Sequence, residues 1–230
     1  MDSVKYIILD FGKVLAYPTT GHWFITPRFM ELVDMSNIDL TRFDECTKNL
    51  NDILSKKVVN RKEEYEMFFT FYTQLFDMLD YPYKSKELIN DIVYDMVYTS
   101  NKYRLYDEVK TELEELSKKY TLLLLSDNWP CCVDIMKEYV IDKYFDRLYI
   151  SSIYGCKKSD EIFFDYPIND YKINTGEAIF IDDNPNLLEI ACRKGLGVRL
   201  MDREKKYQDS EYPIIHNLSE LEIYDKIKCK

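Results

Sequence analysis

The chain has 230 residues, of which 46% are hydrophobic and 31% charged, and its formal net charge is −10. This composition is typical of a globular protein with a sizeable core. The acidic excess argues against nucleic acid and against anionic membrane surfaces as partners, because both recruit basic side chains. No apolar run approaches the roughly 18 residues of a membrane-spanning helix, and we therefore expect a cytoplasmic protein.

Short apolar runs that suit buried strands recur along the chain. They are Tyr6–Leu9, Thr121–Leu125, Leu148–Ile150, Ala178–Ile181 and Gly197–Leu200. Helical patterns lie between them, at Asp107–Tyr120, Pro130–Val140 and Asn186–Lys194. Such alternation predicts an α/β fold with a doubly wound parallel sheet, a Rossmann-like core.

One region interrupts this alternation. Residues 18–101 contain no convincing buried strand, and their helical patterns cover Arg42–Leu54, Lys62–Leu79 and Lys84–Tyr98. We therefore predict two domains: an α/β core formed by residues 1–17 and 102–230, and a small helical cap, residues 18–101, inserted after the first strand. The tail Leu218–Lys228 has the pattern of a closing helix.

The chain has six cysteines: Cys46, Cys131, Cys132, Cys156, Cys192 and Cys229. They form no C-x-x-C pair, and neither histidine lies close in sequence to a cysteine, so no zinc ligand set is visible. A chain of this length does not need disulfides to stabilise its core, and we expect reduced thiols.

Polar side chains follow the predicted strands at the edge where open α/β sheets bind ligands. In chain order they are Asp10, Ser126, Ser151, the Lys157–Lys158 pair, Asp182 and Asp183. Each has a simpler explanation when taken alone, such as a helix N-cap for an aspartate or a solvated pair for the lysines. Together, their carboxylates suit Mg²⁺ and their hydroxyls and lysine suit a phosphate.

Four motifs in this order resemble those of the haloacid dehalogenase superfamily, whose members are mostly Mg²⁺-dependent phosphohydrolases. They are YIILDFGKVL (6–15), LLLLSDN (122–128), SSIYGCKKSDEIF (151–163) and FIDDNPNLLEIACRKGLGVRL (180–200). The resemblance implies that Asp10 is the nucleophile and that Ser126 and Lys158 are catalytic. Ser126, Asp127 and Lys158 are the implied phosphate-binding residues, with Lys157 as the alternative lysine. Asp10, the Gly12 carbonyl, Asp182 and Asp183 are the implied Mg²⁺ ligands.

The helical insert sits where this superfamily places a cap that closes over the site and selects the substrate. We expect the stretch Gly21–Phe29 to form its lip, where Trp23, Phe24 and Arg28 could contact the leaving group.

Gly12 departs from the common pattern. Most phosphatases of the superfamily carry an aspartate here that serves as general acid and base, although a branch with D-x-G, including sugar-phosphate phosphatase-like proteins, does not. Lys13, Asp127 and His22 are candidates for the missing proton transfer. A conformational explanation is also open, in which the turn after the strand requires a positive φ at Gly12.

The leading hypothesis is a Mg²⁺-dependent phosphomonoesterase that acts through an aspartyl-phosphate on a small cytoplasmic phosphorylated metabolite. An alternative is a non-catalytic or weakly active ligand-binding or regulatory protein, since Gly12 replaces the usual acid. A carbon–halogen hydrolase is less favoured, because such relatives need no metal and the Asp182–Asp183 pair is intact.

Overall fold

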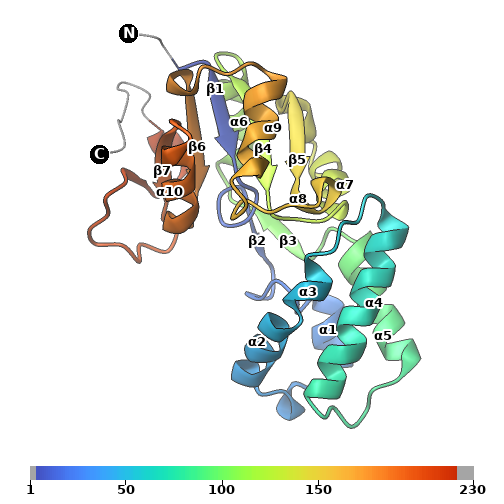
Figure 1. The fold of residues 1–230 in the computed structure, drawn as a ribbon. Helices are drawn as coiled ribbons and strands as arrows, with labels where there is room; N and C mark the ends of the chain where they lie inside the picture. Colours follow the sequence, from blue (N-terminus) through green and yellow to red (C-terminus); the bar gives the residue numbers. More distant parts are fainter. Residues whose placement is uncertain (1–3, 222–230) are drawn as a thin grey trace.

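A six-stranded parallel sheet forms the centre of the computed structural model, which describes residues 4–221. Its strand order is β5-β4-β1-β6-β7-β8 (Figure 1). The strands are β1 (Tyr6–Leu9), β4 (Thr121–Ser126), β5 (Arg147–Ile150), β6 (Ala178–Asp182), β7 (Gly197–Met201) and β8 (Ile214–Ile215). The predicted parallel α/β sheet is thus confirmed, and β8 is an additional edge strand that the apolar runs did not indicate.

Alternate residues of the strands pack on opposite faces of the sheet. Ile7 and Leu9 of β1 belong to one hydrophobic cluster, whereas Ile8 belongs to another. Helices α6 (Val109–Ser117) and α7 (Cys131–Glu138) contribute to the first cluster. Helices α9 (Ile162–Asp170) and α10 (Pro185–Arg193) contribute to the second. Burial on both faces explains why these strands are continuous apolar runs.

Residues 19–102, which we call the helical insert, separate two short strands, β2 (Ala16–Pro18) and β3 (Tyr103–Leu105). Its helices are α1 (Pro27–Leu32), α2 (Leu40–Asn49), α3 (Asn51–Leu54), α4 (Arg61–Met78) and α5 (Lys86–Tyr98). They enclose a hydrophobic cluster of their own. Asn60 caps α4 by accepting hydrogen bonds from the backbone of Lys62 and Glu63. The predicted helix 42–54 is in fact two helices that meet at Leu50.

The insert faces the carboxyl ends of the sheet strands (Figure 1). Strands β2 and β3 pair antiparallel and carry the chain from the sheet to the insert and back. Neither strand was predicted, because three residues are too few for a clear apolar run. We propose that the core and cap domains divide where the sequence pattern changes, at 17/18 and 101/102.

Two further expectations concern the C-terminal region and the thiols. Residues Leu218–Glu220 form a 3-10 turn, and the rest of the predicted closing helix lies outside the described residues. Cys46, Cys131, Cys132 and Cys156 are free. Cys192 is disulfide-bonded, so the expectation of six reduced thiols is wrong for this residue; Cys229 lies outside the described residues.

Within residues 4–221, no helix combines the length and apolarity that crossing a membrane requires.

Candidate active site

The predicted site residues meet at the carboxyl edge of the sheet. Asp10 directly follows β1, and Asp182 is the last residue of β6. The backbone N–H of Asp10 donates to the carbonyl of Ile181 at 3.1 Å, which continues the pairing of β1 with β6 by one residue. Because the two strands are parallel and in register, both carboxylates emerge at the same edge.

Asp10, Asp182 and Asp183 form a cluster that we call the acid trio. One ligand atom of each residue lies within 4.8 Å of the others. Asp182 is 0% exposed and Asp10 is 6% exposed. Burial raises the pKa of Asp182 to about 7, with the charge of Lys158 opposing this shift, and it also raises the pKa of Asp183. Three carboxylates clustered in a buried place would be stabilised by a cation, and an all-oxygen donor set fits Mg²⁺.

Lys158 lies between two members of the acid trio. Its Nζ is 2.9 Å from Asp10 Oδ1 and 2.6 Å from Asp182 Oδ2, and the residue is 2% exposed. Burial opposes the charge on the ammonium group, but the two carboxylates outweigh it and raise its pKa. The Asp182 contact is a hydrogen bond, whereas Asp10 Oδ1 has no aligned donor among residues 4–221. Asp10 Oδ1 is therefore buried and held by Lys158 through an ion pair.

The adjacent lysine has a different partner. Lys157 Nζ donates to Asn51 Oδ1 of α3 at 2.8 Å, so it links the core to the helical insert. The spacing of the third motif favoured Lys158 over Lys157, and the structure places Lys158 beside the acid trio.

The loop after β4 supports the site from the other side. Ser126 is buried at the end of β4. Asp127 Oδ1 accepts a hydrogen bond from the backbone N–H of Lys158 at 2.9 Å. The backbone N–H of Asn128 donates to Ser151 Oγ at 3.1 Å. These two bonds tie the loop after β4 to the segment after β5, and they hold Asp127 and Lys158 together.

A cavity of about 320 Å³, which we call the acid cavity, opens above these residues. Its lining includes Asp10, Gly12, Lys13, Trp23, Asp127 and Asp183. Phe24 also lines it, so two of the three residues expected at the lip lie where predicted. The third, Arg28, instead pairs with Glu31 and Asp91 on the insert.

Gly12 does not have a positive φ. The glycines with positive φ in the described part of the chain are Gly21, Gly155 and Gly195. Lys13 has a φ of 54°, so the left-handed residue of this turn comes one position later. The conformational explanation for Gly12 is therefore wrong. Lys13 Nζ lies 3.5 Å from Asp183 Oδ2 in this arrangement.

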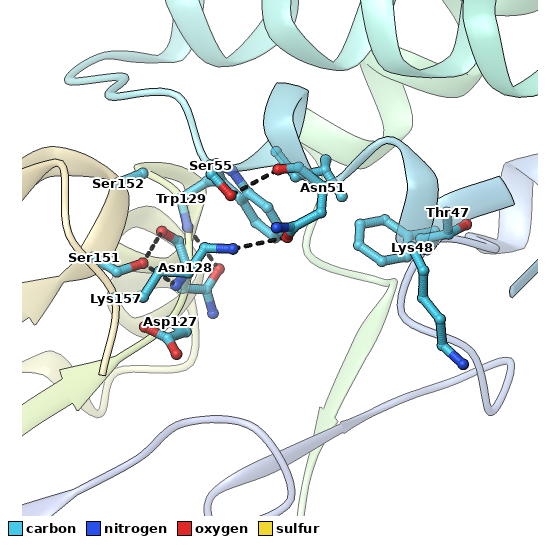
Figure 2. Close-up of a pocket in the computed structure, with 12 residues that line it drawn as sticks. Thr47, Lys48, Asn51, Ser55, Asp127, Asn128, Trp129, Ser151, Ser152 and Lys157 are labelled. Carbon is cyan, nitrogen blue, oxygen red and sulfur yellow. Dashed lines mark hydrogen bonds between the residues drawn. The ribbon is translucent and has the colours of Figure 1, made fainter. Parts of the chain in front are cut away.

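A second cavity of about 420 Å³, which we call the seam cavity, lies between the core and the helical insert (Figure 2). Thr47, Lys48 and Asn51 of α2 and α3 line it, as do Ser152 and Lys157 of the core. Phe24, Asp127, Asn128 and Trp129 line both cavities, so the two adjoin. The hydroxyl oxygens of Thr47 and Ser152 are buried and lack hydrogen-bond partners.

Several lining residues were missed in the sequence. Asn128 and Trp129 directly follow the Ser126–Asp127 pair, and this position was a usable signal. Thr47 and Asn51 carried no signal, because polar residues on a short helix are ordinary solvent-facing residues. His22, a candidate for proton transfer, pairs with Asp44 at 2.8 Å and does not line the acid cavity.

Comparisons with known proteins agree with this architecture. The 2-haloacid dehalogenase of Pseudomonas syringae pv. tomato is similar in structure, with 18% identity, a TM-score of 0.64, and coverage of 94% of this chain and 95% of that one. The HAD-hydrolase YfnB of Bacillus subtilis, bound to magnesium, has 14% identity and a TM-score of 0.68, with 95% and 97% covered.

The HAD family enzyme BT-2542 of Bacteroides thetaiotaomicron, in complex with magnesium and inorganic phosphate, has 17% identity and a TM-score of 0.63, with 89% and 98% covered. At these identities the likeness is one of fold. No curated protein matches the sequence. The model of the haloacid dehalogenase-like hydrolases matches residues 4–191. The chain therefore belongs to the haloacid dehalogenase-like hydrolase family, as its four motifs predicted.

Proposed function

We propose that this hydrolase is a Mg²⁺-dependent phosphomonoesterase that acts on a small phosphorylated metabolite through an aspartyl-phosphate. The observation that carries the proposal is the acid trio with Lys158 in contact with two of its members. A carboxylate can attack phosphorus only where the negative charge of the phosphate is offset. A fixed ammonium group 2.9 Å from Asp10 meets part of that requirement.

Asp10 is the nucleophile in this scheme. One of its oxygens attacks phosphorus, the bond from phosphorus to the leaving oxygen breaks, and the phosphoryl group is carried on Asp10 until water removes it. Lys158 holds a positive charge beside the reacting oxygens throughout. The buried hydroxyl of Ser126 and the backbone of the loop after β4 are the proposed phosphate contacts on the opposite side.

Asp10, Asp182, Asp183 and the Gly12 carbonyl are the residues that would hold Mg²⁺. Bound there, the ion would supply the additional positive charge that a phosphate dianion requires. Burial, and to a smaller extent repulsion from Asp10, raises the pKa of Asp182 and Asp183, and a bound cation would offset both effects.

The seam cavity is the proposed place for the leaving group. It adjoins the acid cavity, and its volume is suited to a metabolite-sized group. Its lining combines the aromatic rings of Phe24 and Trp129 with the polar side chains of Asn51, Asn128 and Lys157, which favours a leaving group that can form hydrogen bonds.

Two other functions fit the site less well. A 2-haloacid dehalogenase has a similar fold, but the three-carboxylate cluster suits a metal ion, which carbon–halogen hydrolysis does not use. A non-catalytic ligand-binding protein would explain Gly12, yet it would not require a buried Lys158 in contact with both Asp10 and Asp182.

The test is a phosphate-release assay over a panel of phosphomonoesters, in Mg²⁺ and in chelator, with the wild-type protein and Asp10→Asn. We expect release only by the wild type in Mg²⁺. Release that persists in chelator, or in Asp10→Asn, would contradict the mechanism. No release from any ester in Mg²⁺ would favour the non-catalytic alternative.

A further inference from the structure

The proposed reaction needs a group that moves a proton, and Gly12 has no side chain to do so. Among residues 4–221, the ionisable residues lining the acid cavity are Asp10, Lys13, Tyr103, Asp127 and Asp183. The inference below rests on the proposed function, and it asks which of these residues is free for proton transfer.

Four of the five have other roles or unsuitable protonation. Asp10 is the nucleophile, and Asp183 belongs to the acid trio. Lys13 is paired with Asp183. Burial raises the pKa of Tyr103 well above its ordinary value, so this phenol holds its proton too tightly to exchange it near neutral pH. Asp127 is the one that remains.

The position of Asp127 suits the task. Of the residues that line both cavities, Asp127 alone has an ionisable side chain, so it lies where the reaction centre meets the leaving group. Figure 2 shows it on the core side of the seam cavity, with Asn51 and Thr47 on the side of the insert. The backbone N–H of Lys158 holds one carboxyl oxygen, Oδ1, and thereby orients the other.

We propose that Asp127 is the general acid and base that replaces the missing aspartate at position 12. In the first step, protonated Asp127 gives its proton to the leaving oxygen as the bond from that oxygen to phosphorus breaks. In the second step, Asp127 carboxylate takes a proton from the attacking water. The bond from phosphorus to Asp10 then breaks, and inorganic phosphate leaves with Asp10 and Asp127 restored.

The electrostatic surroundings of Asp127 are consistent with this exchange. The side chain of Asp127 faces the cavity, but the surrounding protein desolvates its carboxyl group and thereby raises its pKa. The charge of Asp10 raises the pKa further, whereas Lys158 and Lys157 lower it. The other charged or titratable groups around it are Cys156, Lys13 and Asp183 of the core and Lys48 of the insert. A raised carboxyl pKa brings the acid and base forms closer to balance at neutral pH.

The test compares Asp127→Asn with the wild type on a series of aryl and alkyl phosphates, measured by rapid mixing in Mg²⁺. The amide oxygen of Asn can still accept the hydrogen bond from Lys158, so the loop should be retained. We expect the first step to slow by about 10²–10⁴-fold on alkyl phosphates, which need a proton, and far less on aryl phosphates with good leaving groups. The phosphorylated enzyme should accumulate in the variant, visible as added mass after quenching.

Two further variants complete the test. Asp127→Glu keeps a carboxyl group and should recover part of the alkyl phosphate rate. His22→Asn removes one of the two other candidates, which lies outside the acid cavity, and should leave both steps unchanged.

The outcomes separate the two proposals. An active wild type with an unaffected Asp127→Asn variant overturns this inference and leaves the proposed function intact. Equal losses on all leaving groups would mean a structural role for Asp127 and also overturn it. A wild type inactive on every ester overturns both.

Discussion

Trp23 of the helical insert packs directly over Gly12 of the core. A Cβ atom built at Gly12 would lie 3.1 Å from Trp23 Cη2 and 3.3 Å from Trp23 Cζ2. Such distances are shorter than most Cβ contacts, so the indole would have to shift by a few tenths of an ångström to admit a Cβ atom at position 12. The same Cβ would lie 3.8 Å from Asp10 Oδ2. Trp23 therefore occupies the space beside Gly12, close to the proposed nucleophile Asp10, and an aspartate at position 12 would compete with the indole ring for that space.

Restoring an aspartate at position 12 should not improve the enzyme by itself. Gly12→Asp has no backbone penalty, because φ at this position is not positive, but its carboxylate must push Trp23 aside. We expect no gain in turnover, or a loss, from Gly12→Asp alone. In a Trp23→Ala background the same change should speed hydrolysis of the aspartyl-phosphate. Steady-state rates of the two single variants and the double variant give the coupling between the positions. Additive effects would contradict the steric argument.

The two adjacent lysines should differ sharply in their effect on turnover. Lys158→Met keeps most of the side-chain length but removes the charge beside Asp10, and we expect kcat to fall by about 10²–10³-fold. Lys157→Met is the matched comparison, because it removes a hydrogen bond to Asn51 and a charge at the seam cavity but no contact with Asp10, so we expect a change mainly in KM. Phosphate release in saturating Mg²⁺ measures both. Similar losses of kcat in the two variants would mean that turnover depends on positive charge near the site rather than on the contact of Lys158 with Asp10.

Mg²⁺ should stabilise the folded protein through the acid trio. A ligand that binds only the folded state raises the melting temperature, and we expect this rise for the wild type. Asp183→Asn should lose most of it, because one of three charged ligands becomes neutral. Asp91→Asn, on α5 of the insert and paired with Arg28, is the control. An undiminished rise in Asp183→Asn would place the Mg²⁺ site elsewhere.

Glu64 should stabilise the contact between the insert and the core. Its side chain on α4 is 0% exposed, and Oε2 accepts a hydrogen bond from the backbone N–H of Cys131 at 2.8 Å, at the start of α7. Glu64→Ala leaves this N–H without a partner and should lower the free energy of unfolding by about 1–3 kcal/mol. Glu64→Gln keeps an acceptor oxygen and should lose less. Urea denaturation of the three proteins measures the difference.

The same residue predicts a pH dependence of stability. Burial raises the pKa of Glu64 in the folded protein. Between the ordinary carboxyl pKa and this raised value, the folded chain binds more protons than the unfolded chain. The free energy of unfolding of the wild type should therefore fall, relative to Glu64→Gln, as the pH rises through that interval. Parallel pH profiles for the two proteins would show that Glu64 does not titrate differently on folding.

Much of the core could be predicted from local patterns, because strands buried on both faces must be continuously apolar. Thr121–Leu125 and Ala178–Ile181 were each one residue short of the observed strands, and the missing residues were Ser126 and Asp182. A polar residue ends an apolar run in the sequence. In the structure, Ser126 and Asp182 are the last residues of their strands, and they place a functional side chain at the edge of the sheet. Strands β2 and β3 escaped prediction because they are stabilised by pairing with each other, a contact between distant segments.

Chain order and residue type were enough to identify Asp10, Asp182 and Asp183 as one cluster, since parallel strands bring their carboxyl ends to a common edge. They were not enough to explain Gly12 or to rank Asp127 above His22. Those answers depend on Trp23, Thr47 and other insert residues, which approach the core only after the helices pack. The sequence pattern of the insert does not show which of its residues will line a cavity. A residue that faces a ligand and a residue that faces water can be the same polar amino acid.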